Sequence, residues 1–239
     1  MTQLYLSRAR LRRDSQALSA LSSLLLPHDT SAQIKSGHHL IWALFGDTPE
    51  RNRDFLWRQE EPGSFYILSE RPPADPHGLF EIDAPRPFEP NLRTGDALEF
   101  RLRANATISR HIPGQKRGKR HDVVMDALHH IPGRQPSEKG GTSLRAEARL
   151  ALVQDAGSAW LTRQAQDRGF SLPTPPRVDS YDTVVIPRTP QQSPATFGVM
   201  EFEGILTVTN PEIFLTSLQS GFGRAKSFGC GLMLIRRAW

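Results

Sequence analysis

Apolar residues in the first third of the chain recur at spacings that predict strands and one helix. The run 4–11 predicts a short strand, and residues 30–45 carry apolar side chains at helical spacing after a candidate cap at Asp29, Thr30 or Ser31. Two strand-like runs, 54–59 and 64–70, are joined by Glu60-Glu61-Pro62-Gly63, which predicts a hairpin. Residues 78–88 are expected to supply a fourth strand.

The same order of elements restarts after a proline-rich break at Pro85, Pro87 and Pro90. The expected elements after this break are a strand over 98–104, a helix over 143–168, strands over 181–188 and 200–208, a helix after Asn210-Pro211 and a final strand over 232–237. Each half therefore roughly follows the order β-α-β-β-α-β, which is typical of ferredoxin-like domains. The second half shows this order more clearly, because the second helix of the first half has only a weak signal. The predicted fold class is α+β with two tandem ferredoxin-like (RRM-like) domains at 1–88 and 97–239, with a linker at 89–96.

Charge and cysteine content narrow the class of protein. The 239 residues carry a formal net charge of +5 and a single cysteine, Cys230. One cysteine excludes an intramolecular disulfide framework and fits a reducing compartment, so we expect a cytoplasmic protein. No apolar run approaches the ~20 residues of a membrane helix. A basic balance favours anionic partners, nucleic acid first and membrane surfaces second, although many basic proteins bind neither.

The positive charge is concentrated in the window 100–121, which contains no Asp or Glu. Its cationic residues are Arg101, Arg103, Arg110, Lys116, Arg117, Lys119 and Arg120. Seven like charges around a loop favour contact with phosphates, and the alternative is a solvated surface. A second cluster at Arg8, Arg10, Arg12 and Arg13 is interpreted as the polar face of the first strand.

A glycine-rich run, GFGRAKSFGCG, spans residues 221–231. Its members Gly221, Gly223, Gly229 and Gly231 allow close approach of the backbone to a ligand, and Arg224, Lys226 and Ser227 lie between the two glycine pairs. Free N–H groups in such a loop form an anion-binding concavity. The run matches neither a P-loop nor a dinucleotide fingerprint, and the alternative reading is a flexible turn.

The eight histidines lack the spacing of a metal site, so we expect no metal. Imidazole can transfer a proton near neutral pH. His38 falls at the edge of the apolar side of the helix expected over 30–45, and His39 points further towards solvent. The alternative for both is an ordinary helix histidine.

Three segments resemble the CasE family, the repeat-processing endoribonucleases of type I-E CRISPR systems within the RAMP superfamily. These segments are HHLIWALF at 38–45, FRLRANATISR at 100–110 and FEGILTVTNPEIFLTSLQSGFGRAKSFGCGLM at 202–233. The family typically has proline where this chain has Ala106. Residues 12–30 match weakly, and 122–143 look like an insertion.

The resemblance implies an endoribonuclease without metal or cofactor that cuts CRISPR repeat RNA 3′ of its stem-loop by attack of the ribose 2′-hydroxyl. His38 maps onto the family's catalytic histidine, and His39 is the alternative. Many relatives carry tyrosine where this chain has Lys35, so Lys35 is expected either to supply positive charge or to face solvent. The resemblance places the glycine-rich run and the basic window on the RNA, with Asn105 either contacting RNA or capping the basic loop.

The implied partners are the repeat RNA hairpin and other subunits of the Cascade complex, with no membrane and no direct DNA contact. Two alternatives stay open from the sequence. One is a non-catalytic RNA-binding RAMP subunit of a CRISPR complex, because superfamily members often keep the glycine loop and lose the histidine. The other is a basic nucleic-acid chaperone or DNA binder unrelated to CRISPR.

Overall fold

The computed structural model describes residues 3–14, 20–46, 53–111, 114, 118–129, 144–187 and 192–238, with no side-chain description for 144–148 and 150. The chain divides into two compact units. Unit 1 comprises 1–91, 184–196 and 218–232, and unit 2 comprises 92–183, 197–217 and 233–239. The glycine-rich run therefore groups with unit 1, whereas the ranges expected from sequence put it in the second domain. Those expected boundaries stay a prediction.

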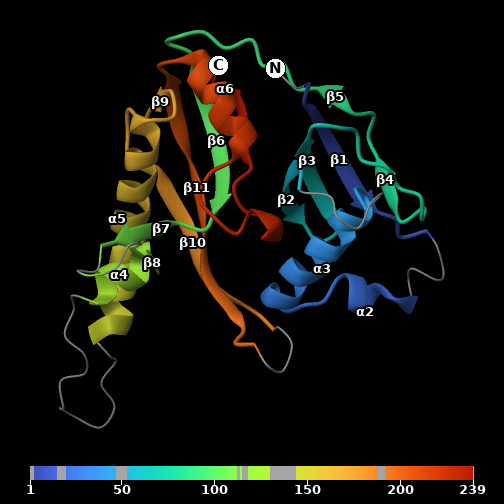
Figure 1. Cartoon of the computed structure of the whole chain (residues 1–239), viewed down its shortest axis with the longest axis horizontal. Coiled ribbons are helices and arrows are strands. Elements are labelled where there is room, and N and C mark those ends of the chain that lie inside the picture. Colours follow the sequence, from blue (N-terminus) through green and yellow to red (C-terminus); the bar gives the residue numbers. More distant parts are fainter. Residues whose placement is uncertain are drawn as a thin grey trace. The chain divides into compact units, whose positions relative to one another are not determined.

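Unit 1 is built on an antiparallel sheet with the strand order β2-β3-β1-β4, and β5 also pairs with β1 (Figure 1). Its elements are β1 (Tyr5–Leu11), α2 (Ser22–Leu25), α3 (Thr30–Ala43), β2 (Phe55–Glu61), β3 (Ser64–Ser69), β4 (Phe80–Ile82) and β5 (Arg86–Pro87). This strand order is that of a ferredoxin-like sheet. The second helix of the pattern is missing, because residues 70–79 contain no helix.

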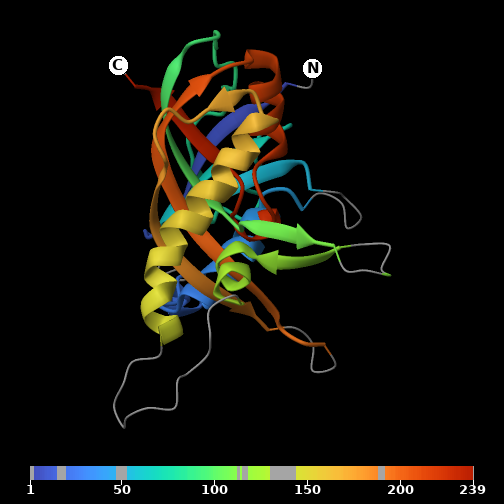
Figure 2. The ribbon, with the colours of Figure 1, turned by 90° about the vertical axis from the view of Figure 1, so that its left-hand side faces the viewer.

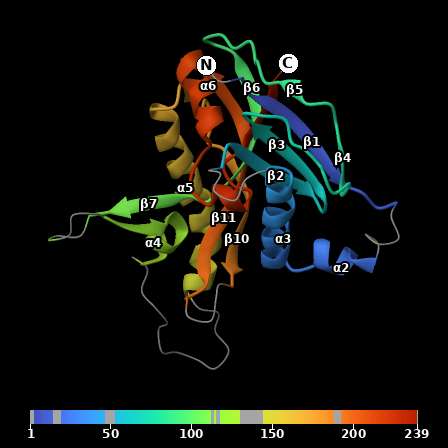
Figure 3. The ribbon, with the colours of Figure 1, turned by 45° about the vertical axis from the view of Figure 1, so that its right-hand side comes forward.

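The core of unit 1 lies between α3 and one face of this sheet (Figure 3). Leu40 and Ile41 of α3 and its C-cap residue Leu44 pack into one cluster with Phe65 and Trp57 of the strands. Asp29 is the N-cap of α3, since its carboxylate accepts the N–H of Ala32 at 2.7 Å.

Unit 2 has a second antiparallel sheet, ordered β10-β11-β6-β12, with β9 paired to β11. Its elements are β6 (Ala97–Ala104), β7 (Thr107–Arg110), β8 (Lys119–Asp122), α4 (Val123–His129), α5 (Leu144–Gln166), β9 (Phe170–Ser171), β10 (Arg177–Ile186), β11 (Ala195–Val208), α6 (Pro211–Ser220) and β12 (Met233–Arg237). The order again matches the ferredoxin-like pattern, with α5 and α6 as the two helices.

Helix α5 covers one face of this sheet, and the hairpin β7–β8 projects away from it (Figure 2). Trp160 of α5 packs against Phe202 of β11, with ring centroids 5.6 Å apart. The side-chain oxygen of Asn210 accepts the N–H of Ile213 at 3.1 Å, so Asn210 caps α6 ahead of Pro211, as the sequence predicted. The fold class of two ferredoxin-like domains is confirmed.

Candidate active site

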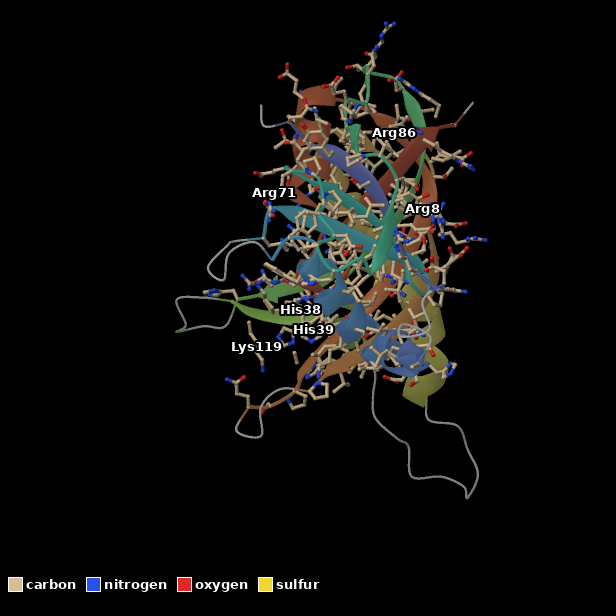
Figure 4. All side chains as sticks on the ribbon, turned by 90° about the vertical axis from the view of Figure 1, so that its right-hand side faces the viewer. Arg8, His38, His39, Arg71, Arg86 and Lys119 are labelled. Atoms are coloured by element: carbon tan, nitrogen blue, oxygen red, sulfur yellow. The ribbon has the colours of Figure 1, made fainter. Side chains whose placement is uncertain are left out.

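His38 lies in the middle of α3, half-buried, with His39 exposed beside it (Figure 4). This agrees with the sequence prediction that His38 sits at the edge of the apolar side and His39 faces solvent. The two rings have centroids 5.3 Å apart. Lys35 is exposed one helical turn before His38, so its side chain and that of His38 lie on neighbouring turns.

The ring of His38 is held by the glycine-rich run. Its Nδ1 lies 2.8 Å from the backbone oxygen of Ser227, and its centroid lies 5.2 Å from that of Phe228. Ser227 and Phe228 belong to a single 3-10 turn, η1 (Lys226–Phe228). Two segments 189 residues apart in the sequence therefore meet within unit 1.

Trp57 of β2 supports the same contact and was missed by the sequence reasoning. Its indole Nε1 donates to the oxygen of Ser227 at 3.3 Å. A Cβ atom on Gly37 would lie 2.9 Å from the indole Cη2, and one on Gly229 would lie 2.9 Å from Cζ3. The indole is thus packed between α3 and the loop. No local sequence signal marks this role, because Trp57 and its partners come from three segments that are distant in the sequence.

A backbone hydrogen bond joins the two ends of the glycine-rich run, and three of its glycines are buried. The N–H of Phe222 donates to the oxygen of Gly231 at 2.9 Å, and Gly229 has a φ of +76°, which favours glycine. Gly221, Gly229 and Gly231 are buried, whereas Arg224 is exposed. The Nζ of Lys226 donates to the oxygen of Ser220 at 2.6 Å. These contacts argue against a flexible turn.

The surroundings of His38 favour its neutral form. Burial lowers the pKa of His38 below its ordinary value of 6.5. The hydrogen bond to the Ser227 oxygen opposes this by raising the pKa, and the neighbouring His39 lowers it further. At neutral pH the imidazole therefore has a lone pair available to accept a proton.

The cations of the basic window lie in unit 2, and acidic residues from outside the window accompany two of them. Arg103 forms an ion pair with Glu201, which lies opposite it on β11. Arg110 forms a two-pronged pair with Asp126 of α4, with its shortest contact at 2.6 Å. A charge count within 100–121 alone could not detect these partners.

The remaining cations of the window differ in position. Arg101 is exposed on β6, and Lys119 and Arg120 are exposed on β8. Lys116 and Arg117 lie outside the described residues, as does 130–143 of the expected insertion. Asn105 is buried and donates to the oxygen of Gly198 at 2.8 Å, which favours the structural role among the two alternatives.

Two properties of the described residues bear on metals and membranes. No group of three or more His, Cys, Asp or Glu side chains in this part of the chain converges as a metal site would require. Among the helices of the described ranges, none is both long and apolar enough to cross a bilayer.

The fold places the chain among proteins with two ferredoxin-like units, here with a histidine held against a glycine-rich loop. The CRISPR associated protein family matches residues 4–237, and the chain belongs to that family.

Three similar proteins illustrate the relationship. The CRISPR system Cascade subunit CasE of Escherichia coli K12 is 27% identical over 223 residues, covering 89% of this chain and 96% of CasE. The CRISPR-associated endoribonuclease Cse3 of Thermus thermophilus is 26% identical over 167 residues, covering 66% of this chain and 64% of Cse3. A solved structure of Thermus thermophilus Cse3, bound to an RNA representing a pre-cleavage complex, has a TM-score of 0.65 at 23% identity and covers 98% and 99% of the two chains.

Proposed function

We propose that this protein is a site-specific endoribonuclease that cleaves CRISPR repeat RNA 3′ of its stem-loop. The observation that carries the proposal is the half-buried His38, whose Nδ1 lies 2.8 Å from the oxygen of Ser227 in the glycine-rich run. The family relationship supports it, since one relative is named an endoribonuclease and another a Cascade subunit. An oriented, neutral imidazole is the group that a cleavage by proton transfer needs.

The proposed reaction needs only the RNA, groups of this chain and water. His38 takes the proton of the ribose 2′-hydroxyl, the 2′-oxygen forms a bond to phosphorus, and the bond from phosphorus to the 5′-oxygen breaks. The 5′-oxygen takes a proton from water, and the imidazolium then returns its extra proton to water. The products are a 2′,3′-cyclic phosphate and a 5′-hydroxyl, and no step requires a metal ion or cofactor.

Cations then hold the phosphates and stabilise the developing charge. We propose that Lys35, one helical turn from His38, supplies a positive charge that stabilises the transition state. The groups proposed to contact RNA are Arg101, Arg103, Arg110, Lys116, Arg117, Lys119 and Arg120, together with Gly221, Gly223, Arg224, Lys226, Ser227, Gly229 and Gly231. An A-form stem hides its base edges in a deep major groove, so recognition rests mainly on shape and backbone.

The same proposal includes the partners and the compartment. After cleavage the protein keeps its RNA product and acts as a subunit of a Cascade complex in the cytoplasm, without direct DNA contact. The relative named as a Cascade subunit and the lone, buried Cys230 support this assignment.

Substitution of the histidine tests the activity. His38→Ala should lower the single-turnover cleavage rate of a repeat hairpin by about 10²–10⁴-fold, the usual contribution of a general base. RNA affinity should stay nearly unchanged, and the wild-type protein should cleave in EDTA. His39→Ala is the matched neighbour and should retain cleavage.

Four outcomes would contradict parts of the proposal. Loss of cleavage in His39→Ala but not in His38→Ala would move the base to His39, and a requirement for added Mg²⁺ would remove the mechanism. Tight hairpin binding without cleavage by the wild-type protein would favour the non-catalytic RNA-binding subunit, for which Lys35 in place of tyrosine is the supporting observation. Equal affinity for random RNA would favour a general nucleic-acid binder.

A further inference from the structure

The backbone oxygen of Ser227 determines which nitrogen of His38 can carry a proton in the neutral ring. A carbonyl oxygen can only accept a hydrogen bond, so the nitrogen 2.8 Å from it must be the donor. The neutral imidazole has one N–H, which this contact places on Nδ1. The lone pair then lies on Nε2, on the opposite side of the ring.

We propose that the glycine-rich run is a positioning device that locks His38 in the Nδ1–H tautomer through the Ser227 carbonyl, so that Nε2 is the proton acceptor. This inference rests on the proposed catalytic role of His38 and deepens it. It also gives the glycine-rich run a second task besides RNA contact, namely the orientation of the base. Ser227 acts through its backbone, and Trp57 acts through its N–H to the same oxygen.

The geometry of the turn explains why the carbonyl stays in place. The Ser227 oxygen accepts from both His38 Nδ1 and Trp57 Nε1, so two donors on different elements fix its direction. The turn is bracketed by Ala225, with a φ of +50°, and Gly229, with a φ of +76°. Because the residues at both ends have a left-handed backbone conformation, the chain reverses sharply, and the Ser227 carbonyl points back at α3.

Gly229 is the position where a side chain would break this arrangement. Its Cβ would meet the Trp57 ring at 2.9 Å, closer than real Cβ contacts, and its φ already disfavours other residues. Gly229→Ala should therefore displace either the indole or the turn, and the Ser227 carbonyl moves with both. A displaced carbonyl leaves His38 free to adopt the Nε2–H tautomer.

The charged groups around the ring do not select the tautomer. Lys35 and His39 lie on α3, and Arg224 and Lys226 lie in the run. Nearby positive charge disfavours the protonated ring as a whole, whereas only a hydrogen-bond partner distinguishes Nδ1 from Nε2.

The test is a long-range ¹H–¹⁵N NMR experiment on the RNA-free, full-length protein, at a pH where His38 is neutral. The His38 resonances are assigned by their loss in His38→Gln. We expect a protonated Nδ1 and an unprotonated Nε2, whereas an Nε2–H tautomer would overturn the inference. Because this readout needs no cleavage, it stays valid even if His38→Ala remains active and the proposed function fails.

A pair of glycine variants then links the tautomer to the rate. Gly229→Ala should populate the Nε2–H tautomer and lower the single-turnover cleavage rate at saturating RNA at least tenfold. Gly78→Ala is the matched control, since Gly78 has a φ of +65° in the same unit with nothing within 4 Å of the added Cβ. It should leave both the tautomer and this single-turnover rate unchanged. An unchanged tautomer and an unchanged single-turnover rate in a folded Gly229→Ala protein would contradict the inference.

Discussion

At the scale of the residue, the protonation of His38 depends on groups that the structure brings around one imidazole. Burial lowers its pKa, the Ser227 hydrogen bond raises it, and His39 lowers it again. Only the neutral ring can accept the 2′-hydroxyl proton. The cleavage rate should therefore rise with pH through the pKa of His38 and level off above it, with a midpoint below the ordinary value of 6.5.

Removing the neighbouring histidine should move this midpoint. His39→Gln removes the electrostatic effect by which His39 lowers the pKa of His38, so the pKa of His38 rises and the acidic limb of the pH–rate profile shifts to higher pH. The profile is measured under single-turnover conditions with RNA well below saturation, so that it reports the pKa of His38 in the free protein. The rate on the plateau should change little.

His77→Gln is the control for this shift, because His77 is also exposed but lies outside the site. Its pH–rate profile should overlay that of the wild-type protein. A shift to lower pH in His39→Gln, or an equal shift in both variants, would show that His39 does not act on the pKa of His38.

At the scale of the element, Asp122 ties together the end of β8, the start of α4 and β10. Its Oδ1 accepts the N–H groups of Val124 at 2.9 Å and Met125 at 3.1 Å, and the hydroxyl of Tyr181 at 2.9 Å. Burial and the Asp122 carboxylate raise the pKa of Tyr181, so the hydroxyl stays a donor at any physiological pH. The cap and the tyrosine contact both depend on one side chain.

Asp122→Ala should therefore lower the free energy of unfolding by about 1–3 kcal/mol, since it removes a helix cap and leaves the Tyr181 hydroxyl without its acceptor. Tyr181→Phe removes only one of the three bonds and should cost about 1 kcal/mol. Urea denaturation of the two variants measures the difference. An equal loss of unfolding free energy in the two variants would mean that the capping of α4 contributes nothing to stability.

Elements whose signals are local could be predicted from sequence. Asn210-Pro211 predicted the start of α6, and the candidates Asp29, Thr30 and Ser31 included the residue that caps α3. Strand order also followed, because the β-α-β-β-α-β sequence has one common arrangement. The missing helix at 70–79 was the exception, where the sequence signal in the first half was already weak.

Contacts between distant segments could not be predicted in this way. His38 could be placed on its helix, but Ser227 lies 189 residues away and Trp57 is fixed by its packing against Gly37 and Gly229. The ion pair of Arg103 with Glu201 depends on the register of β6 and β11. Such pairings follow from the assembled sheet, and a single sequence contains no local trace of them.

At the scale of the whole molecule, the question is whether RNA binding depends on the net charge of the protein or on particular cations. Lys119 and Arg120 are exposed on β8, and neither contacts a carboxylate within the described ranges. Arg8 and Arg10 belong to β1, where Arg10 is held by Asp83 at 2.6 Å and Arg8 lies over the ring of Tyr66 at 5.6 Å. Removing either pair takes the formal net charge from +5 to +3.

The two double variants should differ in the salt dependence of binding to the repeat hairpin. Each cation that no longer neutralises a phosphate flattens the plot of log K against log salt concentration by about 1. Lys119→Gln with Arg120→Gln should therefore reduce the slope by about 2, whereas Arg8→Gln with Arg10→Gln should leave it almost unchanged. The slope reports individual cations, because the counterions released on binding are counted at the phosphates that those cations neutralise. If both variants reduced the slope equally, RNA binding would depend on the net charge of the molecule and not on the β7–β8 hairpin.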